Sequence, residues 1–452
     1  MKHAREHWGS RLGFIMAAAG SAVGVGSLWR FPFIVGQNGG GAFVLLYLIF
    51  TFAIGLPVFI AELIIGRKSQ KSAVFAYSDL SGSSKWRFIG WLNLLSCLII
   101  LSFYAVVSGW GVSYTLMSLT QFTKGLDASQ ISGVFDTLFE SGDINLLWLF
   151  LFLLINVGVV YAGVRKGIEK WSKILMPMLL IMLLGLFAFS LTLEGLPKAL
   201  RFVLYPDFGA VTPTSVLSAL GMAFFTLSVA LGIILTYGSY MNRTEDIPRT
   251  ATIVALMTVI VSLLSALMIF PIVFTFGYEP AGGPGLVFKT MPVLFSKLPG
   301  TLILSTLFFT LFVFTALTSS ISLMEMLASN IIEYFNITRK KATLLVAAAA
   351  FVLGIPSALS GTDSLFGNWK KIYGMDFFAT MDFITSSWFM PVAGLLTTFF
   401  VGWVICQKEI RDEFVSGTTL QIWYKPWLFA VRFVAPVVVI LIILQEAGVL
   451  TL

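Results

Sequence analysis

Eleven apolar segments, each long enough to cross a lipid bilayer, dominate this chain of 452 residues. A transmembrane helix needs about 20 predominantly apolar residues. The segments that meet this criterion are residues 11–37, 42–66, 88–121, 145–164, 168–192, 213–240, 248–278, 299–333, 342–359, 378–406 and 427–448. Because 58% of the residues are hydrophobic and only 11% are charged, the composition excludes a soluble globular protein. The sequence therefore predicts an all-α polytopic membrane protein with 11 transmembrane helices.

The distribution of positive charge predicts how these segments are oriented. With the N-terminus placed inside, 21 of the 29 Lys and Arg residues lie at inner ends and loops, seven lie outside, and Arg30 stays within the membrane. A bias of this kind over short loops sets membrane topology. We therefore expect a multi-pass protein of the cell (plasma) membrane with a cytoplasmic N-terminus and an extracellular C-terminus. Since topology explains the net charge of +7, nucleic acid is a poor candidate partner.

The first apolar segment contains residues that interrupt a helix. Gly20, Gly24 and Gly26 each cost about 1 kcal/mol relative to Ala inside a helix, and Pro32 removes a backbone donor. Lipid cannot hydrogen-bond the freed backbone groups, so they must face protein, water or a ligand. The segment therefore predicts a broken helix that forms part of a binding site.

The sixth segment has a similar interruption. Thr226, Ser228 and Gly232 lie in the middle of a 35-residue run, 208–242, that lacks ionisable groups. Interrupted helices at matching positions of two halves are the best sequence indication of a transporter's substrate site. We therefore predict an inverted repeat of five plus five helices. The predicted units are residues 1–192, residues 193–410 and a C-terminal helix within residues 411–452. The alternative is that the small residues only allow close helix packing.

The residues around both interruptions resemble the neurotransmitter:sodium symporter family, whose members have the leucine-transporter fold. The resemblance extends over nearly the whole chain and needs no gap in the first segment. The matching stretches are Arg5–Trp8, Gly20–Gly26, Arg30–Pro32, Gln37–Phe43, Pro57–Gly66, Phe224–Ser228, Thr318–Ser320 and Met381–Asp382. The resemblance implies a sodium-coupled symporter that imports amino acids by alternating access.

By this resemblance, two sodium ions bind near the first interruption, where unwound backbone supplies the oxygen ligands that hard cations prefer. The ligands of one ion are the carbonyls of Gly20, Val23 and Thr315 and the hydroxyls of Thr318 and Ser319. The ligands of the other are the Ala22 carbonyl, the side chains of Ser27, Thr226 and Thr258, and the substrate carboxylate. Since helical hydroxyls also bond to the preceding turn, ordinary packing is the alternative for these residues.

The chain departs from the family pattern at several of these positions. Ser27 stands where an Asn is common, and Thr258 stands where Asn or Asp often occurs. Both residues still offer an oxygen, so the site is retained with shorter side chains. Ser262 replaces the acid of chloride-independent bacterial members, and Met222 stands where a polar chloride ligand is expected. The sequence thus leaves chloride or proton dependence open.

The resemblance places a zwitterionic amino acid between the two interruptions. Its carboxylate meets the N–H groups of Val25 and Gly26 at a half-helix N-terminus, where the helix dipole favours negative charge. Monoamine-transporting members carry Asp where this chain has Gly24, so Gly24 leaves room for the carboxylate. The other groups expected at the polar end of the substrate are the hydroxyls of Tyr104 and Ser228 and the carbonyls of Ala22, Phe225 and Thr226.

The predicted pocket for the substrate side chain contains no charged group. Its lining residues are Ile100, Phe225, Ala230, Leu231, Ser320 and Leu323. Taken singly, each is more typical of a packed core than of a pocket, so the prediction depends on their convergence. We expect a broad range of hydrophobic L-amino acids, both aliphatic and aromatic.

Charged residues inside a membrane are costly and are therefore candidates for functional roles. By resemblance, Arg30 and Asp382 form an outer gate, although a static salt bridge is the alternative. Arg5 and Glu333, with Trp8 beside them, form the inner gate.

Three further sets of residues carry weaker expectations. Glu62 and Glu325 are expected to be structural, satisfied by backbone groups of the broken helices. In the fifth segment, Gly167 and Pro177 are expected to let the cytoplasmic end of the helix unwind, and a plain kink is the alternative. Cys97 and Cys406 are expected to be inert core residues, and no disulfide framework is implied.

Two other function classes fit less well. An intramembrane enzyme lacks support, because the only histidines precede the first segment and no nucleophile and base are paired. A passive channel needs an open polar pore, whereas bulky apolar residues flank both interruptions. The sequence leaves the oligomeric state open.

Overall fold

The computed structural model describes residues 5–278, 285–363, 366 and 368–449, and these residues form helices joined by short turns. Nine helical spans in this part of the chain are long and apolar enough to cross a membrane. They are α3–α4 (Gly41–Ser69), α6 with its preceding turn (Ser84–Leu119), α8 (Gly142–Val160), α9 with its first turn (Val164–Ser190), α13 (Ile247–Thr275), α15 (Thr301–Phe335), α16 (Arg339–Ala358), α18–α19 (Phe377–Val404) and α21–α22 (Gln421–Glu446). Each coincides with one of the predicted segments.

The first predicted segment is broken, as the sequence indicates. Helix α1 (Arg11–Ala22) ends where Val23 leaves helical geometry, with φ −82° and ψ 68°. The chain then resumes as a π-helical turn, Gly26–Arg30, that continues into α2 (Phe31–Gln37). The two halves meet at an angle of 50°, and counting them as one gives a tenth candidate span in the described residues.

The sixth segment is also interrupted. Helix α11 (Pro213–Thr226) and helix α12 (Ile233–Gly238) are separated by six non-helical residues, Leu227–Gly232. Ser228 and Ala230 have φ values of 53° and 67°, in the left-handed region that L-residues adopt only at a cost. The Ala230 N–H donates to Oε1 of Glu62 at 2.6 Å. This buried acceptor stabilises a backbone conformation that cannot continue α11.

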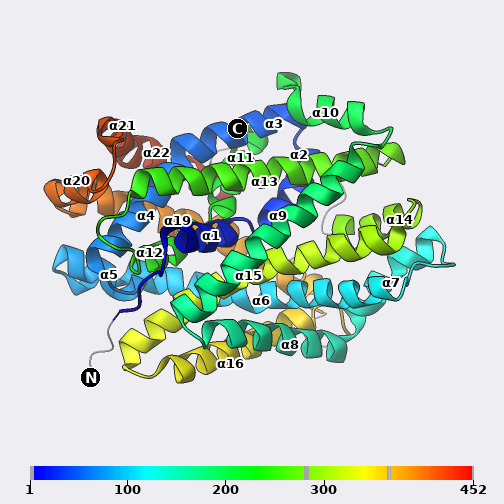
Figure 1. Cartoon of the computed structure of the whole chain (residues 1–452), viewed down its shortest axis with the longest axis horizontal. Coiled ribbons are helices and arrows are strands. Elements are labelled where there is room, and N and C mark those ends of the chain that lie inside the picture. Colours follow the sequence, from blue (N-terminus) through cyan, green and yellow to red (C-terminus); the bar gives the residue numbers. More distant parts are fainter. Residues whose placement is uncertain (1–4, 279–284, 364–365, 367, 450–452) are drawn as a thin grey trace.

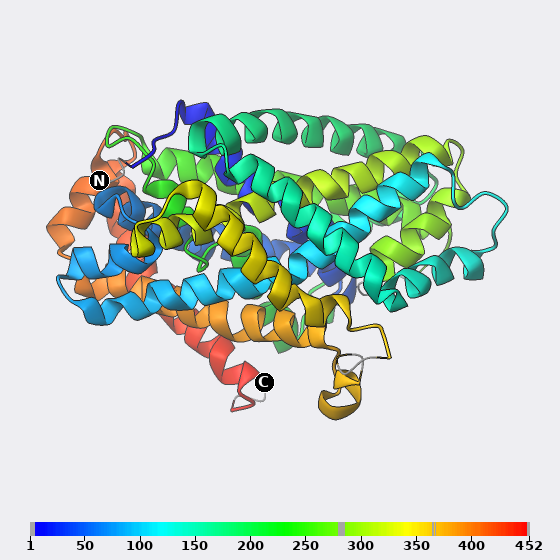
Figure 2. The same ribbon diagram turned by 90° about the horizontal axis from the view of Figure 1, so that it is seen from below.

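Both interruptions lie in the middle of the bundle. Helix α1 contacts α9, α13 and α15, while α12 contacts α4 and α15. Figure 1 shows the short α1 and α12 among the long helices, and Figure 2 shows these long helices packed side by side in a second view. Nearly every residue of α1 from Gly13 onward and all of α12 are buried within the protein. The interrupted backbone therefore faces other protein rather than lipid, which is the only setting in which it is tolerated.

Several shorter helices occupy connections for which the sequence patterns predict no structure. They are α5 (Ala73–Ser81), α7 (Ala128–Glu140), α10 (Leu196–Leu204), α14 (Met291–Ser296), α17 (Trp369–Tyr373) and α20 (Gln407–Val415). One expectation about the predicted core is wrong. Cys97 is buried, but Cys406 is exposed, because the tenth segment ends at Val404 and Cys406 lies just before α20.

Candidate functional site

The carbonyl groups at the end of α1 meet side-chain hydroxyls. In an unbroken helix, the carbonyls of Ser21 and Ala22 would accept N–H groups four residues later. Here Ser21 O accepts from the hydroxyls of Ser228 at 2.9 Å and Ser319 at 3.0 Å. Ala22 O accepts from Ser27 Oγ at 3.4 Å. Hydroxyl groups that can turn aside leave such oxygens available to a cation or an ammonium group.

The residues predicted for one sodium site lie together where α1 meets α15. Ser319 Oγ is 3.4 Å from Gly20 O, and a Cβ at Gly20 would lie 3.2 Å from the Cβ of Thr318. The Thr318 hydroxyl itself donates to Phe314 O and Thr315 O within α15, at 3.1 and 3.0 Å, which is the packing alternative that the sequence leaves open. Val23 follows directly as the residue that ends α1. These candidate ligands are all neutral oxygens, a donor set that suits a hard monovalent cation better than a transition metal.

The residues predicted for the second site are fully buried but less closely joined. Thr226 Oγ1 lies 3.1 Å from the Tyr47 hydroxyl, which is 3.4 Å from Ser262 Oγ. Ser27 contacts the Ala22 carbonyl, as described above. The Thr258 hydroxyl donates to Val254 O at 2.9 Å, which is the packing alternative that the sequence leaves open. Tyr47 is a member of this cluster that the sequence analysis missed.

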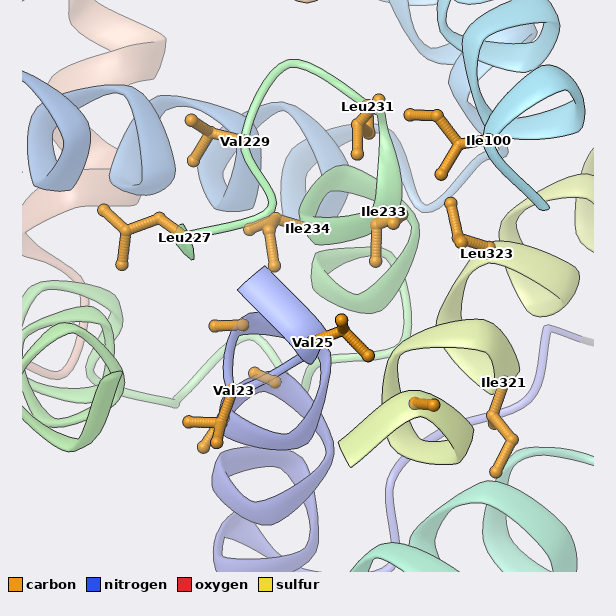
Figure 3. Close-up of a cluster of buried hydrophobic side chains, with 14 of the residues drawn as sticks. Val23, Val25, Ile100, Leu227, Val229, Leu231, Ile233, Ile234, Ile321 and Leu323 are labelled. Carbon is orange, nitrogen blue, oxygen red and sulfur yellow. The ribbon is translucent and has the colours of Figure 1, made fainter. Parts of the chain in front are cut away.

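A cavity of about 50 Å³ lies between the two interruptions. Its lining comprises Ser21, Ala22, Gly24, Val25, Gly26, Ile100, Phe103, Tyr104, Phe225, Ser228, Leu231, Ile233, Ser319 and Leu323. Figure 3 shows the loop of the sixth segment arching over the end of α1, with Ile100, Leu231, Ile233 and Leu323 gathered on one side. No lining residue is acidic or basic. The cavity therefore offers backbone groups and hydroxyls at one end and apolar side chains at the other.

Three residues predicted to contact substrate do not line this cavity. Thr226 directs its hydroxyl towards Tyr47 and Met222 O. Ala230 turns its N–H to Glu62, and Ser320 donates to Asn156 Oδ1 at 2.7 Å. Conversely, Ser21, Phe103 and Ile233 line the cavity although the sequence analysis did not select them as pocket residues. Their sequence surroundings are ordinarily apolar and contain no signal that separates a pocket from a core.

Tyr104 and Phe225 separate the cavity from a second, outer space of about 170 Å³. Both residues line both spaces, together with Val25, Gly26 and Phe103. The Val25 N–H, which was predicted to meet the substrate carboxylate, donates to the Tyr104 hydroxyl at 3.3 Å. The tyrosine oxygen thus occupies the position where a carboxylate oxygen is expected.

The predicted outer pair lies at this second space. Arg30 Nη1 is 3.4 Å from Asp382 Oδ1, and about one third of each side chain is exposed. The Arg30 guanidinium also lies over the Phe225 ring, 4.6 Å from its centroid. One arginine therefore contacts both the acid across the opening and the aromatic ring that closes the cavity.

The predicted inner residues form a tighter group. Arg5 Nη1 lies 3.2 Å from Glu333 Oε2, and its guanidinium stacks on the Tyr240 ring at 4.8 Å. Trp8 is buried, and its Nε1 donates to Tyr237 O at 3.0 Å. Both the outer and the inner pair are therefore formed in this structure.

The environment of one buried acid differs from the prediction. Glu62 accepts from the backbone of the second interruption, as expected. Glu325 instead pairs with Arg339 at 2.5 Å and accepts from the Tyr240 hydroxyl at 2.6 Å. The prediction for Glu325 is wrong because a charged guanidinium, placed by the start of α16, reaches the carboxylate.

The fifth segment is helical throughout its length. Gly167 lies in the π-helical turn Val164–Glu169, and Pro177 lies inside α9 (Lys170–Ser190). A side chain at Gly167 would overlap the Val159 carbonyl, so glycine permits close packing against α8 there. Unwinding of this end remains a prediction.

A buried carboxylate next to this turn escaped the sequence analysis. Glu169 Oε2 accepts the Gly9 N–H at 2.6 Å, and its Oε1 accepts from Ser10 Oγ at 2.9 Å and Lys173 Nζ at 2.6 Å. Its side chain is only 4% exposed. Glu169 therefore joins the chain just before α1 to the start of the fifth segment.

Comparison with known proteins gives one consistent result. A model of the sodium:neurotransmitter symporter family matches residues 5–130 and 126–451. The chain is 37% identical to the uncharacterized sodium-dependent transporter YhdH of Bacillus subtilis, over 98% of each protein. It is 25% identical to the mouse sodium- and chloride-dependent GABA transporter 2, covering 94% of this chain and 76% of that protein.

The structural comparison agrees with the family match. The crystal structure of MhsT in complex with L-phenylalanine superposes with a TM-score of 0.90 at 37% sequence identity. The alignment covers 98% of this chain and all of that one.

Proposed function

The chain belongs to the sodium:neurotransmitter symporter family, and we propose that it imports hydrophobic L-amino acids, both aliphatic and aromatic, together with sodium by alternating access. The family consists of sodium-dependent transporters, not enzymes, which confirms the predicted family and class. The observation that carries the proposal is the cavity between the two interruptions, with backbone carbonyls and hydroxyls at one end and only uncharged side chains elsewhere. A bound phenylalanine in the similar MhsT structure supports a substrate of this class.

The polar end of the cavity suits the backbone of an amino acid. In the proposal, the carboxylate displaces the Tyr104 hydroxyl from the Val25 N–H and accepts from both. The ammonium group takes the place of the Ser228 hydroxyl hydrogen at Ser21 O and also meets Ala22 O. Both charged ends of the zwitterion are then hydrogen-bonded, which their burial requires.

Two sodium ions would be transported with each substrate. One would bind where Gly20, Val23, Thr315, Thr318 and Ser319 converge. The other would bind near Ala22, Ser27 and Thr226, with the substrate carboxylate as a further ligand. Because that carboxylate completes an ion site, substrate and sodium would bind best together.

The ion gradient provides enough free energy for concentrative uptake. Two charges crossing a potential of 100 mV release about 4.6 kcal/mol, at about 2.3 kcal/mol per charge. A tenfold sodium gradient adds about 1.4 kcal/mol for each ion. Together these terms can concentrate a neutral zwitterion by about a thousandfold or more.

Alternating access would require the outer and the inner pair to open in turn. In the proposal, residues 1–192 and 193–410 are inverted repeats, and the C-terminal span within 411–452 lies outside them. The Arg30–Asp382 pair would open towards the exterior, and the Arg5–Glu333 pair towards the cytoplasm, where the N-terminus lies. Loss of contacts around Gly167 and Pro177 would accompany the inward opening.

Uptake into proteoliposomes tests the proposal. Purified protein with an inward sodium gradient should accumulate radiolabelled L-phenylalanine above equilibrium, and replacing sodium by potassium should abolish accumulation. Unlabelled Trp, Phe and Leu should compete, whereas Glu and Lys should not. Equilibration without accumulation would instead indicate a passive channel. Effective competition by a charged amino acid would contradict the uncharged pocket.

A further inference from the structure

An open surface cavity of about 380 Å³ lies at the start of the fifth segment, beside the chain just before α1. It is lined by Gly9, Arg165, Glu169, Lys170, Lys173 and Ile174. Arg165, Lys170, Lys173 and Ile174 are exposed, while Glu169 is buried at the base. None of the residues assigned above to sodium, substrate or either gate lines this space.

The cavity has a surplus of positive charge. Its single carboxylate, Glu169, already accepts from Gly9, Ser10 and Lys173. Arg165 and Lys170 form no ion pair with any acid in the described part of the chain. Two cations in a concave space, beside a third that is only partly neutralised, form a site for an anion.

The cavity continues into an apolar face of α9. Trp171, Ile174, Met178, Ile181 and Leu184 are all at least 40% exposed, and their spacing of three or four residues places them on one side of the helix. In the most apolar stretch of 18 residues within Val164–Ser190, only 33% of the residues are buried inside the protein. In a membrane, this face would contact acyl chains, and Trp171, beside the basic residues at the start of α9, is of the residue type that favours the headgroup level. Ile174 belongs to both the cavity and the apolar face.

We propose that this cavity binds the phosphate headgroup of an anionic glycerophospholipid, with the acyl chains lying along the exposed face of α9. Arginine can bind phosphate oxygens in a bidentate manner, and lysine adds a point charge. Basic pockets beside membrane helices are suited to lipid headgroups. The continuity of the cavity with an apolar helix face favours a lipid over a free phosphate ion. The proposal does not rest on the transport function, and the orientation of the chain decides only which leaflet supplies the lipid.

The lipid would also influence the carboxylate below it. Lys173 donates to Glu169 at 2.6 Å, and Glu169 holds the chain before α1. A phosphate in the cavity would compete with Glu169 for the Lys173 ammonium group. Binding of the lipid would therefore change how firmly the N-terminal segment is held.

Native mass spectrometry of the purified full-length chain can test the proposal, using phosphatidylglycerol and phosphatidylcholine with identical acyl chains. The test variant is Arg165→Gln with Lys170→Gln. The matched control is Lys340→Gln with Lys341→Gln, which removes two exposed charges near the start of α16, outside the cavity. We expect the wild type to prefer phosphatidylglycerol. The test variant should lose affinity for it by roughly 25-fold, at about fivefold per cation, and the control should change by less than about twofold.

Three results would overturn the proposal. They are equal binding of the two lipids, an equal loss in the control variant, and full displacement of phosphatidylglycerol by inorganic phosphate at the same concentration. The last result would identify a site for a free anion instead of a lipid. Sodium-dependent binding of L-phenylalanine, measured in parallel, shows that each variant is folded. If that binding is absent in the wild type as well, the thermal transition of each variant serves the same purpose, so failure of the proposed function would not obscure this test.

Discussion

The hydroxyl of Ser228 donates to the carbonyl of Ser21 at 2.9 Å, across 207 residues of sequence. Each partner belongs to an interruption: Ser21 lies in the last turn of α1, and Ser228 lies in the loop after α11. In an unbroken helix, the carbonyl of Ser21 would already accept a backbone N–H from four residues later. The two breaks are therefore parts of one site, and the predictions below concern that site and its closure.

Removal of one hydroxyl should lower sodium affinity without altering the fold. We expect Thr318→Val to raise the sodium concentration needed for half-maximal phenylalanine binding by about tenfold or more, if one oxygen ligand of the ion contributes as much as a hydrogen bond to a charged group, about 1.5–3 kcal/mol. The matched control is Thr315→Val, because only the carbonyl of Thr315 is a proposed ligand and its hydroxyl bonds to Leu311 O and Phe312 O. Sodium titrations of ligand binding compare the two. An equal loss of sodium affinity in both variants would contradict the proposed sodium site.

Two substitutions at Gly24 should separate the effect of an added negative charge on substrate binding from the effect of a larger side chain. An added Cβ would overlap the Ser319 hydroxyl, which can rotate away, so Gly24→Ala should weaken phenylalanine binding only moderately. Gly24→Asp adds a negative charge beside the expected substrate carboxylate and should abolish binding. Equilibrium binding of radiolabelled phenylalanine measures both effects. If the Asp variant bound as well as the Ala variant, the carboxylate would have to lie elsewhere.

Loss of the tyrosine hydroxyl at the cavity should weaken substrate binding. We expect Tyr104→Phe to reduce phenylalanine affinity by roughly 10- to 100-fold, because one hydrogen bond to a buried charged group is lost. The ring that separates the two spaces is retained, so sodium binding in the absence of substrate should change little. Calorimetry with each ligand tests this contrast. An unchanged phenylalanine affinity would exclude the proposed contact.

The outer pair should affect release more than stability. Because Arg30 and Asp382 are partly exposed, their pairing contributes only about 0.2–1 kcal/mol. Asp382→Asn should therefore speed dissociation of bound phenylalanine by up to about fivefold and barely shift the thermal transition. Arg30→Gln should speed it further, since the contact with Phe225 is lost as well. Unaltered dissociation in both variants would identify a static salt bridge.

The contact between Glu169 and the N-terminal segment should control local opening. A Cβ at Gly13 would overlap the Glu169 side chain, so Gly13→Ala and Glu169→Gln should both loosen this contact. We expect amide hydrogen exchange in residues 9–13 to become faster by about tenfold, as a charge-assisted hydrogen bond is weakened. Gly185→Ala is the control, because nothing lies within 4 Å of a Cβ there. If Gly13→Ala and Glu169→Gln gave the same exchange rates as Gly185→Ala, Glu169 would not control the opening of the N-terminal segment.

The sequence predicts the helical spans and the first break well, because both depend on local composition. The predicted segment 342–359 corresponds to α16 (Arg339–Ala358), and 88–121 corresponds to α6 (Arg87–Leu119). The break after Ala22 occurs among the glycines that weaken the helix. In the sixth segment, however, the left-handed residues include Ser228 and Ala230, which have no intrinsic preference for that conformation. The sequence predicts this break but not its geometry, because the Ala230 N–H bonds to the distant Glu62 carboxylate.

The site residues also divide into those that the sequence predicts and those that depend on distant contacts. Those suggested by the family resemblance, such as Tyr104 and Leu323, line the central cavity. Phe103 and Ile233 were missed because an apolar residue beside a cavity looks like any core residue in sequence. Glu169 was missed because its partners, Gly9 and Ser10, lie about 160 residues earlier. Such contacts follow from the packed arrangement of the helices and not from any periodic pattern.

The bond between Glu62 and the Ala230 N–H has a consequence for biogenesis. Glu62 is fully buried in α4, and its partner is synthesised 168 residues later. A charged side chain costs about 2.5–3.5 kcal/mol when a lone helix enters lipid. During translation, we therefore expect α4 to stay at the insertion machinery or against earlier helices until the sixth segment emerges. A chain truncated before residue 230 should then be retained and degraded, even though its first five spans are complete.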